Sequence, residues 1–374
     1  MAALIDTHQV SGPGRQLTAL ANALAARDVA LRVVMLQRAG RPRPPFADYL
    51  AAHGVDHVIL EERGPTDLAR PAAALRAALA AFAPDVVQTH SYKTNLLYRL
   101  AARGAPRRPW VAFFHGATAE NLKVRAYHWL DRRLMAAADR IVVMSELHHE
   151  GFGRAAHVRV LHNAVIPVSD AADLPDLAPY RAPDAPLLAV VGRLSHEKGV
   201  DLFLRAVAAL HARGRAVRAV LAGDGPARAE LEALRAELGL ESAVHFLGPV
   251  AAVNALYRAV DLVVLPSRSE GLPNVLLEAL RQDRPVVATA VGAVSEVLTD
   301  PAAGVVVPPG DPEALARGIE AALAAGATPQ ARQARAETAA RFSLDRRVDA
   351  HLALYGELLA AQAAQAAQAA GRAR

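Results

Sequence analysis

The sequence predicts an α/β protein made of two doubly wound domains, each a parallel sheet covered by helices. Short apolar runs of β-type alternate with helical stretches rich in Ala, Leu and Arg, which is typical of parallel sheets with helices on both faces. The alternation restarts after a stretch rich in Pro and Asp. A chain of 374 residues is also too long for one ordinary domain and suits two of similar size.

The predicted strands fall into two series that define the domains. The first strand is short, and further strands of the first series are expected at 31–36, 85–90, 110–115, 140–145 and 158–163. The second series is expected at 187–192, 218–223, 244–248, 262–266, 285–289 and 304–308. Between them, 164–186 has no strand or helix periodicity and is interpreted as the interdomain connection.

The remaining segment is a long amphipathic pattern followed by a biased tail. We expect an N-terminal domain over 1–165, a C-terminal domain over 166–341, a helix over 342–361 that packs back on the N-terminal domain, and a low-complexity tail over 362–374. Repeated Ala and Gln in that tail indicate a frayed helix end or disorder.

Composition excludes several classes of protein. The net charge is +5, but the 42 basic residues are spread along the chain beside 37 acidic ones, so nucleic acid is not an expected partner. No apolar run approaches the roughly 18 to 20 residues that span a bilayer. The start of the chain has no signal-peptide pattern, and there is no cysteine. These features predict a cytoplasmic protein.

Ligands of open parallel sheets bind beyond the carboxyl ends of the strands, so the loops there are the candidate sites. After the first strand, "SGPGRQL" places Gly12 and Gly14 at the start of a helix. Leu17 stands where a dinucleotide fingerprint has its third glycine, and Gln37 stands where an acid would bind ribose, which disfavours hydride transfer. The loop is either a plain turn or a place where backbone N–H groups meet an anion.

Two loops of the second series carry the next candidates. In "GRLSHEKGV", Arg193 and Lys198 lie five residues apart before a helix, an arrangement that suits a diphosphate, although two solvated surface charges are the alternative. In "GDGP", Gly223 opens a glycine turn whose expected role is to shape the binding site.

The loop "SEGLPNVLLEAL" joins an anion site to two carboxylates. Pro273 suits the first position of a helix, which leaves unpaired amides around it. The residues expected to supply them are Gly271, Leu272, Asn274 and Val275. Glu270 precedes these amides and Glu278 follows by about a turn, so the two carboxylates bracket an anion and can accept hydrogen bonds from hydroxyls. A nucleotide sugar has that layout of ribose, diphosphate and sugar.

These motifs, with "VHFLG", "PVVAT" and "GVVVPPGDPEAL", resemble the C-terminal domain of family 4 retaining glycosyltransferases of GT-B architecture. The resemblance covers nearly the whole chain and is most specific over 187–325. The N-terminal half matches more loosely, through its glycine loop and "FFHG". GT-B architecture implies two Rossmann-like domains that face each other across a cleft.

The resemblance also implies roles for single residues. Glu270 would hold the hydroxyls of the donor sugar and Glu278 the ribose, while Arg193 and Lys198 neutralise the diphosphate. The loop after "VHFLG" would take the base, and Phe246 and Leu247 of that motif are substrate-binding candidates. Gly12 would lend a backbone amide, but "SGPGR" departs from the family's Gly-Gly pair and acid, so the phosphate-contacting residue of that loop stays open.

Histidines are the other candidates for chemistry. His115 ends a predicted strand, where a histidine is more often a structural hydrogen-bonding residue; the resemblance places it near the donor sugar and the reacting centre. His53 and His57, and the adjacent His148 and His149, lack metal-site patterns, so no metal or cofactor is expected.

The predicted function is metal-independent, retaining transfer of a sugar from a nucleotide-diphosphate sugar to a glycan or lipid-linked acceptor, in cell-surface polysaccharide or glycolipid synthesis. The alternatives are a nucleotide-sugar epimerase of the same architecture and a catalytically silent sugar-nucleotide sensor. A basic patch with aromatic residues at 121–135 and a basic segment at 37–45 either contact anionic membrane at its inner face or are solvated surfaces.

Overall fold

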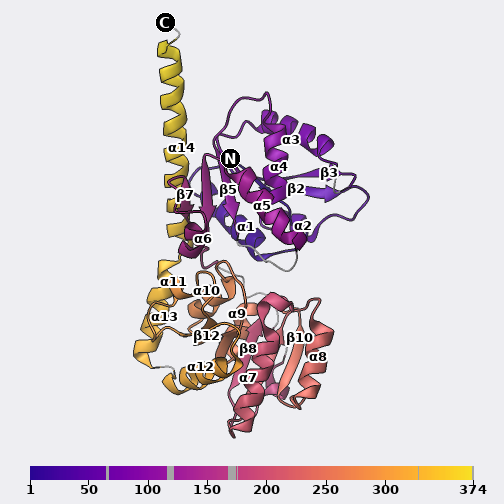
Figure 1. The fold of residues 1–374 in the computed structure, drawn as a ribbon, viewed down its shortest axis with the longest axis vertical. Coiled ribbons are helices and arrows are strands. Elements are labelled where there is room, and N and C mark those ends of the chain that lie inside the picture. The colour runs from indigo at the N-terminus through magenta and orange to yellow at the C-terminus, as the bar shows by residue number, and fades with distance from the viewer. Residues whose placement is uncertain (65–66, 116–121, 167–173, 175, 327, 373–374) are drawn as a thin grey trace. The chain divides into compact units, whose positions relative to one another are not determined.

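The computed structural model divides the chain into two compact units, shown in Figure 1. The N-terminal unit comprises Met1–Asn163 and Leu344–Arg374, and the C-terminal unit comprises Ala164–Ser343. The structure describes all residues except 65–66, 116–121, 167–173, 175, 327 and 373–374, and only the backbone of 122–128 and 371–372. The predicted connection over 164–186 therefore lies partly outside the described residues. No helix in the described part of the chain is both long and apolar enough to cross a membrane.

The N-terminal unit is built on a parallel sheet whose described strands have the order β3-β2-β1-β4-β5-β6-β7. The strands are β1 (Ala2–Ile5), β2 (Arg32–Arg38), β3 (His57–Glu62), β4 (Val87–Thr89), β5 (Trp110–Phe114), β6 (Arg140–Val143) and β7 (Val158–Val160). The helices between them are α1 (Gly12–Ala25), α2 (Pro45–Ala52), α3 (Ala69–Phe82), α4 (Tyr92–Ala101), α5 (Leu122–Met135) and α6 (Glu146–Gly151).

The strand β3 is missing from the sequence prediction. It lies at the edge of the sheet beside β2, and only two of its six residues are buried, whereas every residue of the central strands β1 and β5 is buried. The strand also ends in two acids, Glu61 and Glu62, which are more typical of a polar loop.

The C-terminal unit has a parallel sheet whose described strands have the order β10-β9-β8-β11-β12-β13. The strands are β8 (Leu187–Val191), β9 (Arg218–Ala222), β10 (Val244–Gly248), β11 (Leu262–Leu265), β12 (Val286–Thr289) and β13 (Val305–Val307). The helices are α7 (Val200–Ala212), α8 (Arg228–Glu237), α9 (Val253–Ala259), α10 (Asn274–Arg281), α11 (Val294–Val297), α12 (Pro312–Ala325) and α13 (Pro329–Arg341).

The core of this unit explains why the apolar runs form strands. Helices α7, α8 and α12 contribute Phe203, Leu231 and Ile319 to one cluster of buried side chains with the strands. Asp311 caps α12 by accepting hydrogen bonds from two backbone N–H groups, and Pro312 begins the helix, as the sequence predicts.

The last helix, α14 (Leu344–Arg372), belongs to the N-terminal unit, where it packs against α1. It is the long yellow helix of Figure 1 and continues through most of the Ala/Gln-rich tail. The buried Tyr355 hydroxyl donates to Gln88 Oε1 at 2.8 Å, which ties the helix to β4.

Candidate functional site

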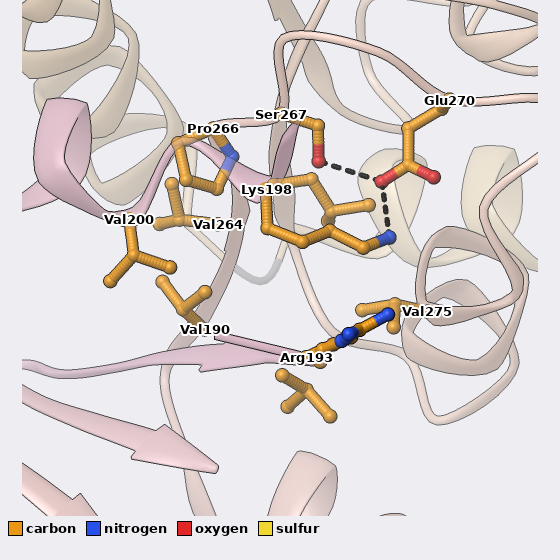
Figure 2. A pocket seen from close by; sticks show the side chains of 12 residues that line it. Val190, Arg193, Lys198, Val200, Val264, Pro266, Ser267, Glu270 and Val275 are labelled. Carbon is orange, nitrogen blue, oxygen red and sulfur yellow. Dashed lines mark hydrogen bonds and ion pairs between the residues drawn. The ribbon is translucent and has the colours of Figure 1, made fainter. Parts of the chain in front are cut away.

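The candidate donor pocket lies at the point of the C-terminal sheet where the direction in which successive strands are added reverses. Strands β8 and β11 are neighbours in the sheet but lie far apart in the sequence. From this pair the chain winds toward β10 on one side and β13 on the other, which makes it the switch point at which open α/β sheets bind ligands. The loops after β8 and β11, with Arg193 and Ser267, line a pocket at this point (Figure 2).

Charged side chains meet in this pocket. Lys198 Nζ lies 2.7 Å from Glu270 Oε1, and the Ser267 hydroxyl donates to the same oxygen at 2.7 Å. The Glu270 side chain is 11% exposed and that of Lys198 29%, so the pair is shielded but within reach of solvent. Arg193 is exposed and lines the same pocket, as does Val275 (Figure 2). The sequence-predicted residues brought together here are thus Arg193, Lys198, Glu270 and Val275.

Backbone geometry fixes the position of Lys198. Gly199 follows it with φ of +63°, and a Cβ there would lie 2.0 Å from the carbonyl oxygen of Pro266. Only glycine permits this approach, because the conformation is left-handed and the contact is shorter than any side chain allows. The turn that carries Lys198 therefore rests directly on the loop after β11.

An ion pair that the sequence analysis missed holds the same two loops together. Arg268 donates to both carboxylate oxygens of Asp201 at 2.6 Å and to the carbonyl of His196 at 3.0 Å. Its backbone N–H also donates to the carbonyl of Glu197 at 2.8 Å. Such a two-point contact is geometrically specific. No local sequence signal reveals it, since its partners are about 67 residues apart.

The predicted anion loop leads into α10. The helix begins at Asn274, and Pro273 is its N-cap with extended backbone, one residue earlier in the helix register than the sequence predicts. One turn into α10, Glu278 Oε2 accepts a hydrogen bond of 2.9 Å from Tyr257, whose side chain is fully buried. Tyr257 lies on α9, and the sequence analysis missed it because nothing local connects it with Glu278.

The other predicted residues of this unit lie outside the lining of the pocket. They are Gly223, Phe246, Leu247, Gly271, Leu272, Asn274 and Glu278. Gly223 has φ of +144°, and a Cβ there would lie 1.8 Å from the carbonyl oxygen of Gly192, so it allows the loop after β9 to lie against the loop after β8. Phe246 and Leu247 are half-buried in β10, with the guanidinium of Arg235 5.4 Å from the Phe246 ring centre.

In the N-terminal unit, the glycine loop begins α1. Gly12 is the first helical residue, and Ser11 is the N-cap, whose hydroxyl accepts from the Gly14 N–H at 3.2 Å. A Cβ at Gly14 would lie 2.8 Å from the Phe46 ring. Gly14 thus has a packing and capping role, and its contact with an anion stays a prediction.

His115 directly follows β5 and is hydrogen-bonded to another histidine that the sequence analysis passed over. His115 Nε2 lies 2.9 Å from His90 Nδ1, and the two rings are stacked at 5.2 Å. Burial, with the positive charge of Arg347, lowers the pKa of His115 to about 4. His115 is therefore neutral at physiological pH.

A charged cluster at the carboxyl ends of β1 and β3 also escaped the sequence analysis. Lys93 Nζ lies 2.6 Å from Glu62 Oε2 and 3.8 Å from Asp6 Oδ2. Burial raises the pKa of Asp6, and Lys93 opposes the rise. The cluster was missed because β3, which ends in Glu62, was missed.

The basic patch on α5 is described only in part. Lys123, Arg125 and Tyr127 lie outside the described side chains. Trp129 is 61% exposed, and the guanidinium of Arg133 lies 4.9 Å from its ring centre. At the other patch, Arg43 is paired with Asp48 at 2.8 Å. Both contacts are compatible with a solvated surface as well as with lipid.

Comparisons with known proteins match both units of the chain. A family model described as "Glycosyl transferase 4-like domain" matches residues 11–168, and one described as "Glycosyl transferases group 1" matches 185–325. The lipopolysaccharide core biosynthesis mannosyltransferase LpcC of Rhizobium leguminosarum is 31% identical over 281 residues, which are 72% of this chain and 78% of that protein. The alpha-D-kanosaminyltransferase of Streptomyces kanamyceticus is 32% identical over 62% of this chain, but the match spans 63% of that protein, less than two thirds of its length.

Solved structures share the fold at low sequence identity. Anabaena Alr3699/HepE, in a crystal structure with UDP-glucose, has a TM-score of 0.78 and 22% identity, covering 96% of this chain and 99% of that chain. Sucrose-phosphate synthase of Thermosynechococcus elongatus has a TM-score of 0.78 and 23% identity over the same shares. The family models, the 31% identical mannosyltransferase and these folds together confirm the predicted family: the chain belongs to the family 4 glycosyltransferases, the glycosyl transferases group 1, and has the GT-B fold.

Proposed function

We propose that this protein transfers a sugar from a nucleotide-diphosphate sugar to a hydroxyl of a glycan or lipid-linked acceptor, with retention at the anomeric carbon and without a metal. The observation that carries the proposal is the grouping of Arg193, Lys198 and Glu270 in one pocket at the switch point of the C-terminal sheet. Two cations suit a diphosphate, and a shielded carboxylate beside them suits sugar hydroxyls.

The role of each group follows from its chemistry. Lys198 and Arg193 stabilise the diphosphate as negative charge develops on it, which is the task that a metal ion performs in other transferases. Glu270 accepts hydrogen bonds from the donor sugar, and Glu278, held by Tyr257, accepts them from the ribose. The loop after β10, next to Phe246 and Leu247, takes the base.

In the proposed reaction, the bond between the anomeric carbon and the diphosphate oxygen breaks while both electrons stay on that oxygen. The acceptor hydroxyl attacks the anomeric carbon from the same face and passes its proton to the departing diphosphate. Glu270 holds peripheral hydroxyls and does not form a covalent intermediate, unlike the nucleophile of a retaining glycosidase. His115 acts on the donor sugar at the reacting centre, and Gly12 contributes a backbone N–H to the phosphate.

The relatives support this choice of substrates. Anabaena Alr3699/HepE is a structural neighbour crystallised with UDP-glucose, and LpcC is named as a mannosyltransferase of lipopolysaccharide core biosynthesis. We therefore propose a part in cell-surface polysaccharide or glycolipid synthesis. The protein would work in the cytoplasm at the inner face of the membrane, with Trp129 and Arg133 on the contacting surface. Flotation with anionic liposomes tests this location, and failure to float would refute it.

The decisive experiment is a thermal-shift panel of UDP-, GDP- and ADP-sugars, because a ligand that binds only the native state raises the melting temperature in relation to its affinity. The selected donor is then incubated with candidate acceptors, with and without EDTA, and the anomeric configuration of the product is read by NMR. Retention in the presence of EDTA is expected. An altered nucleotide sugar formed without acceptor would indicate an epimerase, and binding without turnover would indicate a sensor.

A further inference from the structure

The hydrogen bond between His90 and His115 sets a tautomer in the N-terminal unit. His90 directly follows β4 and His115 follows the neighbouring β5, so the parallel pairing of these strands brings the two rings together. The Nδ1–Nε2 distance of 2.9 Å is that of a good hydrogen bond. The ring of Phe113 stacks on the ring of His90, with 4.6 Å between the ring centres, and fixes the plane of the His90 ring.

A hydrogen bond between two neutral imidazoles has two possible directions. If His90 Nδ1 is the donor, His115 carries its proton on Nδ1, and His90 Nε2 is a bare lone pair. If His115 Nε2 is the donor, His90 carries a proton on Nε2 instead. Whether His90 Nε2 carries a proton therefore distinguishes the two directions of the hydrogen bond.

His90 Nε2 is buried and has no hydrogen-bond partner among the described residues. A buried N–H group without an acceptor is rarer in proteins than an under-satisfied acceptor. The direction that leaves a lone pair at this atom is thus favoured. It makes His90 the donor and leaves the proton of His115 on Nδ1.

The charges around His90 keep its ring neutral. The groups that influence it are His115 from β5 and Arg347 and His351 from α14; burial first, and then these groups, hold the pKa of His90 well below its usual value. The guanidinium of Arg347, which also donates to Gln16 and Asn163, disfavours the doubly protonated ring, so His90 carries a single proton and only its two neutral tautomers are in question.

Within the described part of the chain, His351, on α14, has the same pattern of a hydrogen-bonded Nδ1 and an unpaired Nε2 as His90. Its Nδ1 lies 2.7 Å from the carbonyl oxygen of Arg347, and a carbonyl can only accept, so Nδ1 carries the proton. His351 Nε2 is then a lone pair, and it too is buried without a partner among the described residues. The ring of Phe113 stacks on the rings of both His90 and His351.

We propose that His90 is a positioning residue that donates its Nδ1–H to His115 and thereby holds the proton of His115 on Nδ1. His115 then offers an N–H donor, and not a basic lone pair, to its ligand. The role of this N–H group rests on the proposed function. The Nδ1–H of His115 donates a hydrogen bond to an oxygen of the donor sugar, and His115 does not remove a proton from the acceptor.

The tautomer can be read by ¹⁵N NMR of the histidine side chains in the full-length protein near pH 7. The His115→Gln variant identifies the signals of His115 by their loss, which is needed because the chain has 14 histidines. Protonation of His115 on Nδ1 is expected. Protonation on Nε2 would overturn the proposal, whatever the protein's activity.

Variants of His90 test its positioning role. In His90→Asn, the side-chain amide can replace the Nδ1–H donor, so His115 should keep its tautomer. In His90→Leu, the donor is lost, and His115 should shift toward protonation on Nε2, the form that free imidazole side chains prefer. An unchanged His115 spectrum in a folded His90→Leu protein would refute the positioning role.

Kinetics then connect the tautomer with turnover, using UDP-glucose, or whichever nucleotide sugar the thermal-shift panel selects, as the probe. His90→Leu should lower kcat about tenfold, the effect of one hydrogen bond, with little change in KM, and His90→Asn should restore most of it. Equal kcat in all three proteins would overturn the role in turnover. If the wild-type protein turns over no nucleotide sugar, the proposed function fails, while the NMR result still decides the tautomer.

Discussion

Lys198 and Glu270 form an ion pair, but replacing one or the other should affect the binding of a bare nucleoside diphosphate differently. Each lies in the pocket, 2.7 Å from the other, and Glu270 is also held by Ser267. If Lys198 serves the diphosphate and Glu270 the sugar, replacing Lys198 by Ala should weaken the binding of a bare nucleoside diphosphate. Replacing Glu270 by Gln should not weaken it, because the change removes a negative charge from beside the cation.

The magnitudes follow from the charges. At about 4 Å and an effective dielectric constant near 20, two unit charges interact by about 4 kcal/mol. Loss of one preorganised stabilising group in enzymes has a comparable effect of about 2.7–4 kcal/mol. Lys198→Ala should therefore lower kcat/KM about 10²- to 10³-fold. Glu270→Gln should leave nucleoside diphosphate affinity equal or a few times higher, while it lowers kcat/KM about 10²-fold through the lost sugar contacts.

Calorimetric titration with the bare nucleoside diphosphate, and transfer kinetics with its sugar, measure the two effects separately. The double variant should show a coupling of about 0.5–3 kcal/mol, as contacting residues do. Arg205→Ala is a matched control, since Arg205 is an exposed cation of the same unit that does not line the pocket. If Glu270→Gln weakens nucleoside diphosphate binding as much as Lys198→Ala does, the assignment of roles is refuted.

Three further predictions concern neighbouring groups. Arg268→Ala should loosen the turn that carries Lys198 and weaken nucleoside diphosphate binding about tenfold, since it removes a two-point ion pair; unchanged calorimetric affinity would contradict this. Tyr257→Phe removes the 2.9 Å hydrogen bond to Glu278 and should raise KM for the nucleotide sugar about three- to tenfold at nearly constant kcat, whereas a selective fall in kcat would argue against a ribose contact. For pH, the native pKa of His115 is lowered to about 4 from its ordinary 6.5, so the unfolded chain binds more protons between these values. The free energy of unfolding should thus fall as pH drops from about 6.5 toward 4, and denaturant titrations should show a shallower fall in His115→Gln.

The sequence predicted the parts of the site that are set by local signals. Arg193, Lys198 and Glu270 each lie in a loop that follows an apolar strand and precedes a helix, and glycine or proline marks the turn. Since parallel strands end at the same edge of their sheet, this local pattern was enough to expect the three side chains near one another. The edge strand β3 was not predicted in the same way, because its apolar run, 58–60, is short and is followed directly by two acids.

The sequence by itself determined the family, the fold class and the charged groups of the candidate pocket, because strand, turn and helix signals act over a few residues. Tertiary structure alone decided the contacts that hold these groups: Arg268 on Asp201, Tyr257 on Glu278, and His90 on His115. Each joins side chains on different elements, between about 20 and 70 residues apart. Such pairs arise when packing brings elements side by side, and the periodicity of either segment carries no information about its partner.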